Sequence, residues 1–245
     1  SKGNISLVPG GRTIVEELEY AENATFQYYS GYEVLDVSPS DVFTAAEFNW
    51  KQAAVNVTAS GLETRIQNAG PEQVINLLDS RIRNAEKTMA NNISEGIYSD
   101  GTGSGGKQIG GLQSIVADAG TGTVGGINST TFSFWQNVTS GDVAAISVSS
   151  DALLDEMQDM WLETCRGNDK VDLIVADQTF YKRFWDNLQD IQRITTASEG
   201  VAGFQTLKFV TADVVMDGAP STKKSAIPAL HIYLLNTHYL HFRAP

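Results

Sequence analysis

Cysteine is nearly absent from this chain, since Cys165 is the only one in 245 residues. A single cysteine excludes an intrachain disulfide and gives no indication of an oxidising compartment. No apolar run approaches the roughly 20 residues that a transmembrane helix requires, and no signal peptide opens the sequence. We therefore expect no membrane partner. The sequence begins SKGN without Met, so we expect the natural start to lie upstream or to have been clipped.

Basic residues are also scarce. The 17 Lys and Arg face 29 Asp and Glu, which gives a net charge of -12 and a pI near 4.6. A surface that grips nucleic acid needs Lys and Arg against phosphates, so this composition argues against one. The hydrophobic share of 42% is ordinary for a globular protein and sufficient for a sizeable core.

No catalytic constellation emerges from the residue types present. The three histidines lie near the C-terminus, at His231, His238 and His241. The odd separation of the last two points them to opposite faces of a strand, and Cys165 falls on an apolar helix stripe, so a metal-ligand set is incomplete. A nucleophile elbow in a strand–turn–helix context is absent. The sequence predicts no catalytic residue, no metal site and no cofactor, which indicates a protein that is not an enzyme.

Glycine gathers in two loops, Asp100–Gly111 and Ala117–Gly126. Gly101, Gly103 and Gly106 fit the dinucleotide pattern G-x-G-x-x-G, but they follow a predicted helix where that fingerprint follows a strand. The run from Gly101 nearly spells a phosphate-binding loop, but Gln108 stands where Ser or Thr would bind Mg²⁺. We interpret both stretches as surface loops.

A long helix is predicted from Pro71 to Gly96. Pro suits the first helical position, and Gly is a natural stop. The apolar residues recur every three or four positions and form one stripe; they are Val74, Ile75, Leu78, Ile82, Ala85, Met89 and Ile93. The other faces are polar, so this helix is expected to pack along a single side.

The stretch from Ile14 to Ile66 has the period of extended strands. It is rich in Val, Thr, Tyr and Phe, and Val55, Val57 and Ala59 alternate with polar residues. VSPSD (Val37–Asp41) looks like the tip or bend of a hairpin. A long two-stranded hairpin cannot cover its own faces, so either a core of this chain or a neighbouring subunit covers its aromatic side chains. Residues 1–13 are expected to form an arm that is ordered only against a neighbour.

The remainder predicts a compact α+β unit over residues 112–243. Ser150 or Asp151 is expected to cap a helix that ends by Gly167, and VDLIVA (Val171–Ala176) is a short buried strand. Asp177 is expected to cap a second helix. Two closing stretches, Gln205–Met216 and Ala229–Arg243, are predicted as strands.

Two segments in this order resemble the major capsid proteins of tailed bacteriophages with the HK97-type fold. TVGGINSTTFSFWQN (Thr123–Asn137) is similar to that group's "T-V-G-G-I-N/D … W … N" segment after the spine helix, and IYLLNTHYLHFR (Ile232–Arg243) is similar to its late strand with an L-N-T-x-Y-L core. The resemblance extends from about Gly11 to the end of the sequence.

The resemblance implies an α+β, HK97-like capsid fold with four parts. Residues 1–13 are an N-terminal arm, and residues 14–66 are an extended β-hairpin, the E-loop. Residues 67–111 are the spine helix and peripheral domain, and residues 112–245 are the axial domain and the start of the return to the peripheral domain.

On this resemblance, the implied function is a major capsid protein of a virion. It would be assembled in the bacterial host cytoplasm into hexamers and pentamers of an icosahedral head. The head would enclose double-stranded DNA that the protein contacts weakly and non-specifically, and scaffold, portal or decoration proteins are further possible partners. Large permanent interfaces are aromatic-rich, so we expect inter-subunit contacts at Phe26, Tyr28, Phe48 and Trp50.

One departure and two alternatives accompany this interpretation. Capsid proteins of this kind continue past the late strand with a segment that pairs beside the spine helix, whereas this sequence stops at Pro245. We expect that segment to be missing or the spine to be completed differently. An encapsulin-like nanocompartment shell would share the fold. A soluble α+β ligand-binding protein or enzyme would instead use the Gly101–Gly126 loops.

Overall fold

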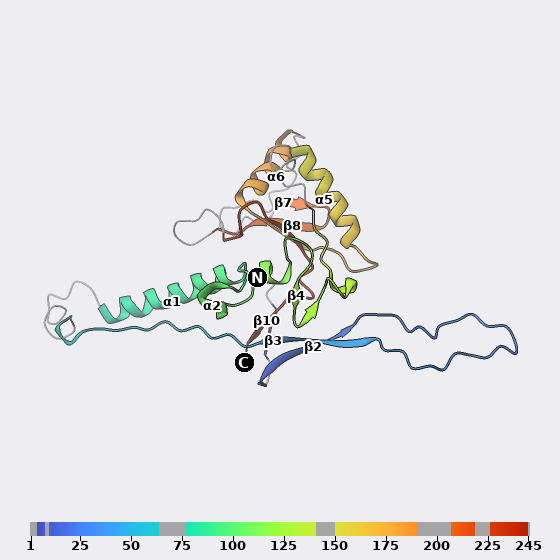
Figure 1. Cartoon of the computed structure of the whole chain (residues 1–245). Helices are drawn as coiled ribbons and strands as arrows, with labels where there is room; N and C mark the ends of the chain where they lie inside the picture. Colours follow the sequence, from blue (N-terminus) through green and yellow to red (C-terminus); the bar gives the residue numbers. More distant parts are fainter. Residues whose placement is uncertain are drawn as a thin grey trace.

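The computed structural model describes residues 4–7, 10–63, 77–140, 150–190, 207–218 and 226–244. A compact unit of helices and sheet stands on a long, flat base (Figure 1). From this base the helix α1 (Leu77–Gly96) extends to one side, and a two-stranded ribbon extends to the other. The chain is therefore an elongated body with one globular part, and not a single rounded domain.

The compact unit is built on a four-stranded sheet with the strand order β7-β8-β6-β9. Its strands are β6 (Leu173–Ala176), β7 (Leu207–Phe209), β8 (Ala212–Met216) and β9 (Ile232–Leu235). β6 pairs parallel to β8 and antiparallel to β9. The helices α5 (Ser150–Thr164) and α6 (Gln178–Asp190) pack against this sheet. The predicted buried strand and both predicted helices of this unit are confirmed.

Strand alternation divides the unit into two cores. Successive side chains of a strand point to opposite faces, so Ile174 faces the cluster that includes Leu153 and Phe184 of the two helices. Its neighbour Val175 faces a second cluster with Leu112 and Tyr233. The second cluster joins the sheet to α3 (Leu112–Ile115), which follows the glycine loop. The sheet is thereby covered on both faces.

Asp177 caps α6 as predicted. Its carboxylate is buried and accepts the backbone N–H of Phe180 at 2.9 Å through Oδ1. Oδ2 accepts the N–H of Leu230 at 2.9 Å. One carboxylate thus satisfies an unpaired donor of the first helical turn and also fixes the segment before β9.

The closing segment differs from the prediction of one long strand. β9 belongs to the sheet, but the chain then turns at Thr237, whose backbone N–H and hydroxyl both donate to the Asp172 carboxylate. β10 (His241–Ala244) leaves the sheet and pairs parallel with β1 (Asn4–Leu7). The expectation that the arm is ordered only against a neighbour is therefore wrong, because the chain's own last strand provides its hydrogen-bonding partner.

The stretch Gln205–Met216 is also broken. Val210 adopts a left-handed backbone with φ of 53°, and this turn folds β7 back onto β8 as an antiparallel pair. The tight reversal gives the sheet its edge strand. One predicted strand is thus two, because a single residue can reverse the chain direction.

The long helix ends at Gly96 as predicted, while its predicted start at Pro71 lies outside the described residues. Its apolar stripe is poorly covered, because Leu78 and Ile82 are exposed. The neighbour along this helix is the chain at residues 51–60, which runs extended beside it (Figure 1). The strand predicted around Val55 and Val57 does not form there, because residues 51–60 pair with no other described strand.

Candidate functional site

The ribbon, residues 13–50, is the feature that leaves the body of the molecule. Its base is the antiparallel pair β2 (Thr13–Glu19) and β3 (Phe43–Asn49), in which Thr13 faces Asn49 and Glu19 faces Phe43. Tyr20 N–H donates to the Val42 carbonyl at 3.0 Å and closes the ladder. Beyond this bond, residues 21–41 form no strand.

The turn of the ribbon lies at Gly31, with a φ of +56°. The Ser30 N–H donates to the Glu33 carboxylate at 3.1 Å across it. The prediction of a tip at Val37–Asp41 is wrong, since this stretch lies on the returning arm. Gly31 sits at the centre of the hairpin register and accepts the left-handed conformation that the reversal needs, whereas VSPSD has Ser and Pro but no glycine.

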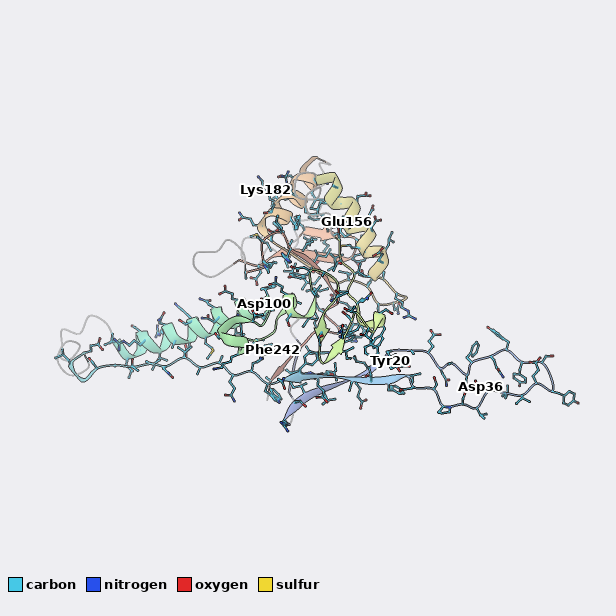
Figure 2. The ribbon with its side chains drawn as sticks, viewed as in Figure 1. Tyr20, Asp36, Asp100, Glu156, Lys182 and Phe242 are labelled. Atoms are coloured by element: carbon cyan, nitrogen blue, oxygen red, sulfur yellow. The ribbon has the colours of Figure 1, made fainter. Side chains whose placement is uncertain are left out.

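The outer half of the ribbon is apolar and uncovered. Phe26 is 75% exposed and Tyr28 is 92% exposed, and their rings touch edge to face with centroids 5.2 Å apart. Further exposed apolar side chains are Tyr29, Tyr32, Val34, Leu35 and Val37. Figure 2 shows the side chains of this half, around Asp36, projecting away from the rest of the molecule. An apolar surface of this extent is typical of a protein–protein contact.

The charged side chains of the ribbon are all acidic. Residues 13–50 contain eight acidic side chains and no Lys or Arg; the acidic residues are Glu16, Glu17, Glu19, Glu22, Glu33, Asp36, Asp41 and Glu47. Hydrogen bonds from the Ser38 hydroxyl and N–H lower the pKa of Asp36 and favour its ionised form. A surface that receives this ribbon must therefore be apolar without being acidic.

The base of the ribbon is anchored by a second, small hairpin. Its strands are β4 (Thr123–Val124) and β5 (Ile127–Asn128). Its turn residue Gly125 has a φ of +58° and rests on Ala46, which is 1% exposed. A Cβ at Gly125 would lie 2.7 Å from the Ala46 Cβ, and the Gly125 carbonyl accepts the Glu47 N–H at 2.9 Å.

This contact gives a physical reason for the TVGG motif. A two-residue hairpin turn favours glycine where φ is positive, and here the missing side chain also lets the turn approach the ribbon. The Trp135 indole N–H, in the 3-10 helix η2 (Ser133–Trp135), donates to the Val124 carbonyl at 3.1 Å and supports the same hairpin. The Gly-Gly pair between apolar residues was the available signal of this anchor.

The four predicted contact residues fall into two groups. Phe26 and Tyr28 lie on the exposed outer half, as described above. Phe48 and Trp50 lie at the base and are half-buried within their own chain. The Trp50 indole N–H donates to the Gly11 carbonyl at 3.0 Å, and Phe48 lies close to Gly125.

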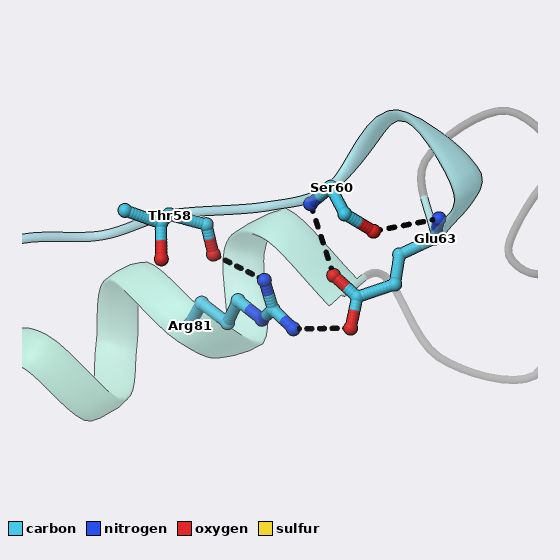
Figure 3. A network of polar contacts seen from close by, with 4 residues as sticks. All are labelled: Thr58, Ser60, Glu63 and Arg81. Atoms are coloured by element: carbon cyan, nitrogen blue, oxygen red, sulfur yellow. Dashed lines mark hydrogen bonds and ion pairs between the residues drawn. The ribbon is translucent and has the colours of Figure 1, made fainter.

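The continuation of the ribbon is tied to the long helix by Arg81. Its guanidinium donates to the Thr58 carbonyl and forms an ion pair of 2.9 Å with Glu63 (Figure 3). The Ser60 N–H donates to the same Glu63 carboxylate at 3.1 Å. The bond from Ser60 and then that from Arg81 lower the pKa of Glu63. A second tether joins Lys51 to the Gly106 carbonyl at the end of α2 (Gly103–Gly106).

The glycine loops do not form a phosphate cradle in this fold. The first follows α1, and its short helix α2 contains left-handed Ser104 and Gly105. An open cavity of about 640 Å³ lies beside this loop, and its lining includes Glu95, Asp100 and Asp177. Because three carboxylates line it and Asp177 already accepts two backbone N–H groups, the cavity does not favour an anionic ligand.

Within the described ranges, no group of three His, Cys, Asp or Glu side chains is arranged to hold a metal ion. Also within those ranges, no helix combines the length and the apolar character needed to cross a membrane.

The fold of this chain, but not its sequence, is similar to that of known proteins. No protein-family model matches the sequence, and no curated protein matches it. Among solved structures, the "Cyanophage A-1(L) capsid asymmetric unit" matches with a TM-score of 0.65 and 15% sequence identity. The match covers 99% of this chain and 70% of that chain. At this identity the likeness concerns the fold, and the chain accordingly has a phage capsid-like α+β fold.

Proposed function

We propose that this protein is a shell protein whose copies assemble side by side into a viral capsid. The observation that carries the proposal is the exposed aromatic ribbon, on a chain that matches a phage capsid protein over 99% of its length. An apolar ribbon that its own chain does not cover is stabilised when a neighbouring copy covers it.

The energy available at the ribbon is comparable to the stability of a domain, which is about 5–15 kcal/mol. Burying one Phe or Tyr side chain contributes about 1.5–3 kcal/mol, so the four rings of Phe26, Tyr28, Tyr29 and Tyr32 contribute about 6–12 kcal/mol before costs. Association and the ordering of residues 21–41 consume part of this gain. In the proposed shell, each copy both gives and receives a ribbon.

The finer proposal follows the HK97-type resemblance. Hexamers and pentamers of this chain form an icosahedral virion shell around double-stranded DNA, with residues 14–66 as the E-loop, α1 as the spine helix and the compact unit as the axial domain. The net charge of -12 fits a container, because a strongly basic inner wall would hold the DNA by phosphate contacts and hinder its release. Phe26, Tyr28, Phe48 and Trp50 are the proposed inter-subunit contacts.

Negative-stain microscopy and analytical ultracentrifugation of the purified full chain test the proposal. We expect rings, sheets or closed particles. Tyr28→Ala and Phe26→Ala should shift material toward monomer, while the matched variant Tyr28→Phe, which keeps the ring, should assemble normally. A Phe26→Ala/Tyr28→Ala chain that assembles as well as the parent protein, with unchanged particle stability, would refute the role of the ribbon.

Trp50→Ala and Phe48→Ala need an additional control, because both side chains also pack within their own chain. Their unfolding midpoints are measured on dissociated chains, and only a loss of assembly beyond the loss of chain stability counts as an inter-subunit effect. The encapsulin-like alternative is distinguished by the contents of the particles. Nucleic acid inside them supports a virion, and packaged protein cargo supports a nanocompartment.

A further inference from the structure

The helix α5 presents an acidic outer face on the compact unit. Asp155, Glu156, Asp159 and Glu163 follow one another at helical spacing, and none of them forms an ion pair with another described residue. Leu162 lies on the same face and is 71% exposed. This face therefore presents one sign of charge to any partner, with Leu162 as its apolar contact.

The helix α6 carries the opposite charge in its first half. Lys182 is exposed, Arg183 is half-buried, and neither forms an ion pair with a described residue. Three other cations of this part of the chain do have carboxylate partners, namely Arg166, Lys208 and Arg243. Asp186 follows one turn after Lys182, so the cationic surface is confined to the start of the helix.

The two helices pack side by side in one core cluster, and their outer surfaces form two flanks of the compact unit. Figure 2 shows Lys182 on α6 at one side of this unit and Glu156 on α5 at the other. Among the described residues, no ion pair joins the two sets of charges within a copy. The two sets can pair between copies that are related by a rotation about an axis beside this unit.

We propose that the acidic flank of α5 on one copy docks against the cationic start of α6 on the next copy, head to tail around a ring. The partner is a second copy of this chain, and the inference rests on the proposed function of self-assembly. A heterologous contact of this kind closes into a ring when the rotation allows it. Charge complementarity favours this orientation and disfavours contact between two flanks of the same charge, while burial of Leu162 adds apolar contact.

Two charge-reversed full chains test the inference. The α5 variant is Asp155→Lys/Asp159→Lys/Glu163→Lys, which leaves only Glu156 acidic on that flank and makes both flanks cationic. The α6 variant is Lys182→Glu/Arg183→Glu, which makes both flanks acidic. Each variant alone should assemble about tenfold less than the parent protein or worse. The 1:1 mixture should recover assembly, because unlike copies can alternate around a ring with an even number of subunits.

The variant that combines both reversals is the matched control. Its three changes to Lys raise the net charge by 6 and its two changes to Glu lower it by 4, so the value of -10 stays close to the parent value of -12, and its flanks are again complementary. It should assemble alone, and its unfolding midpoint confirms that the substitutions leave the fold intact. Recovery in the mixture and in the combined variant supports the docking.

Three outcomes would overturn it. If the parent protein assembles and each single-flank variant assembles equally well, the flanks do not meet, although the proposed function stands. If both single-flank variants fail while neither the mixture nor the combined variant recovers, the two flanks do not face each other. If the parent protein remains monomeric at all concentrations, the proposed function fails together with this inference.

Discussion

Replacing Gly125 by Ala tests how the ribbon is held on the body of the molecule. The new Cβ would lie 2.7 Å from the Ala46 Cβ and 3.1 Å from the Phe48 ring. Both distances are shorter than an ordinary van der Waals contact, and overpacking of this kind costs about 1–3 kcal/mol. The φ of +58° adds a left-handed backbone penalty of about 1–2 kcal/mol for a residue with a side chain.

Gly126→Ala provides the matched control. Gly126 is the second residue of the same turn, with a φ of +81°, and a Cβ there meets no described heavy atom within 4 Å. It therefore carries the backbone penalty without the steric clash. We expect Gly125→Ala to be less stable than Gly126→Ala by about 1–3 kcal/mol, or roughly 2–4 °C for each kcal/mol in a chain of this size.

Urea unfolding of both variants measures this difference, and hydrogen exchange locates it. The Glu47 amide, which donates to the Gly125 carbonyl, should lose protection in Gly125→Ala and keep it in Gly126→Ala. Equal stability of the two variants, together with a protected Glu47 amide in both, would show that the close approach of this turn does not anchor the ribbon.

Two further predictions concern single side chains. Hydrogen bonds from Ser60 and Arg81 lower the pKa of Glu63. The ionised carboxylate therefore stabilises the folded contact fully above its ordinary pKa of 4.5. This stabilisation is lost as the pH falls through the lower pKa that Glu63 has in the folded chain. Limited proteolysis of the chain near Glu63 should therefore accelerate in acid, and Glu63→Gln should remove this pH dependence; a cleavage rate that does not change between pH 7 and pH 3 would contradict the assignment. Tyr233 is 5% exposed, its hydroxyl finds no hydrogen-bond partner among the described residues, and burial and then Asp118 raise its pKa to about 12. Tyr233→Phe should therefore leave stability unchanged or raise it by up to about 1 kcal/mol in urea unfolding, whereas a clear loss of stability would indicate a partner for this hydroxyl.

Local elements were predictable where one short-range rule dominates. The apolar run at β6 and the helical spacing after Ser150 determine their elements without help from the rest of the chain. The Asp177 cap also follows from local chemistry, since its carboxylate reaches a backbone donor three residues ahead. The late strands were less predictable, because their boundaries depend on Val210 and on the Asp172–Thr237 contact, which joins residues 65 positions apart.

The ribbon was likewise predictable only in part. Its aromatic content and its extended period are visible in the sequence, but its turn at Gly31 follows from the pairing register of β2 with β3. Only the fold shows that Phe48 and Trp50 serve the base while Phe26 and Tyr28 remain uncovered. Strand pairing was predictable only where the partner lies nearby in sequence, so the pairing of β1 with β10 was missed.

The sequence by itself determined the net charge, the helical and extended periods, and the acidity of the ribbon, because these properties belong to residues and their near neighbours. The tertiary structure decided which apolar surfaces remain exposed, where the ribbon is anchored and how opposite charges separate onto two flanks. These depend on contacts between distant segments, such as Ala46 with Gly125, and the geometry of the assembled chain determines which segments meet.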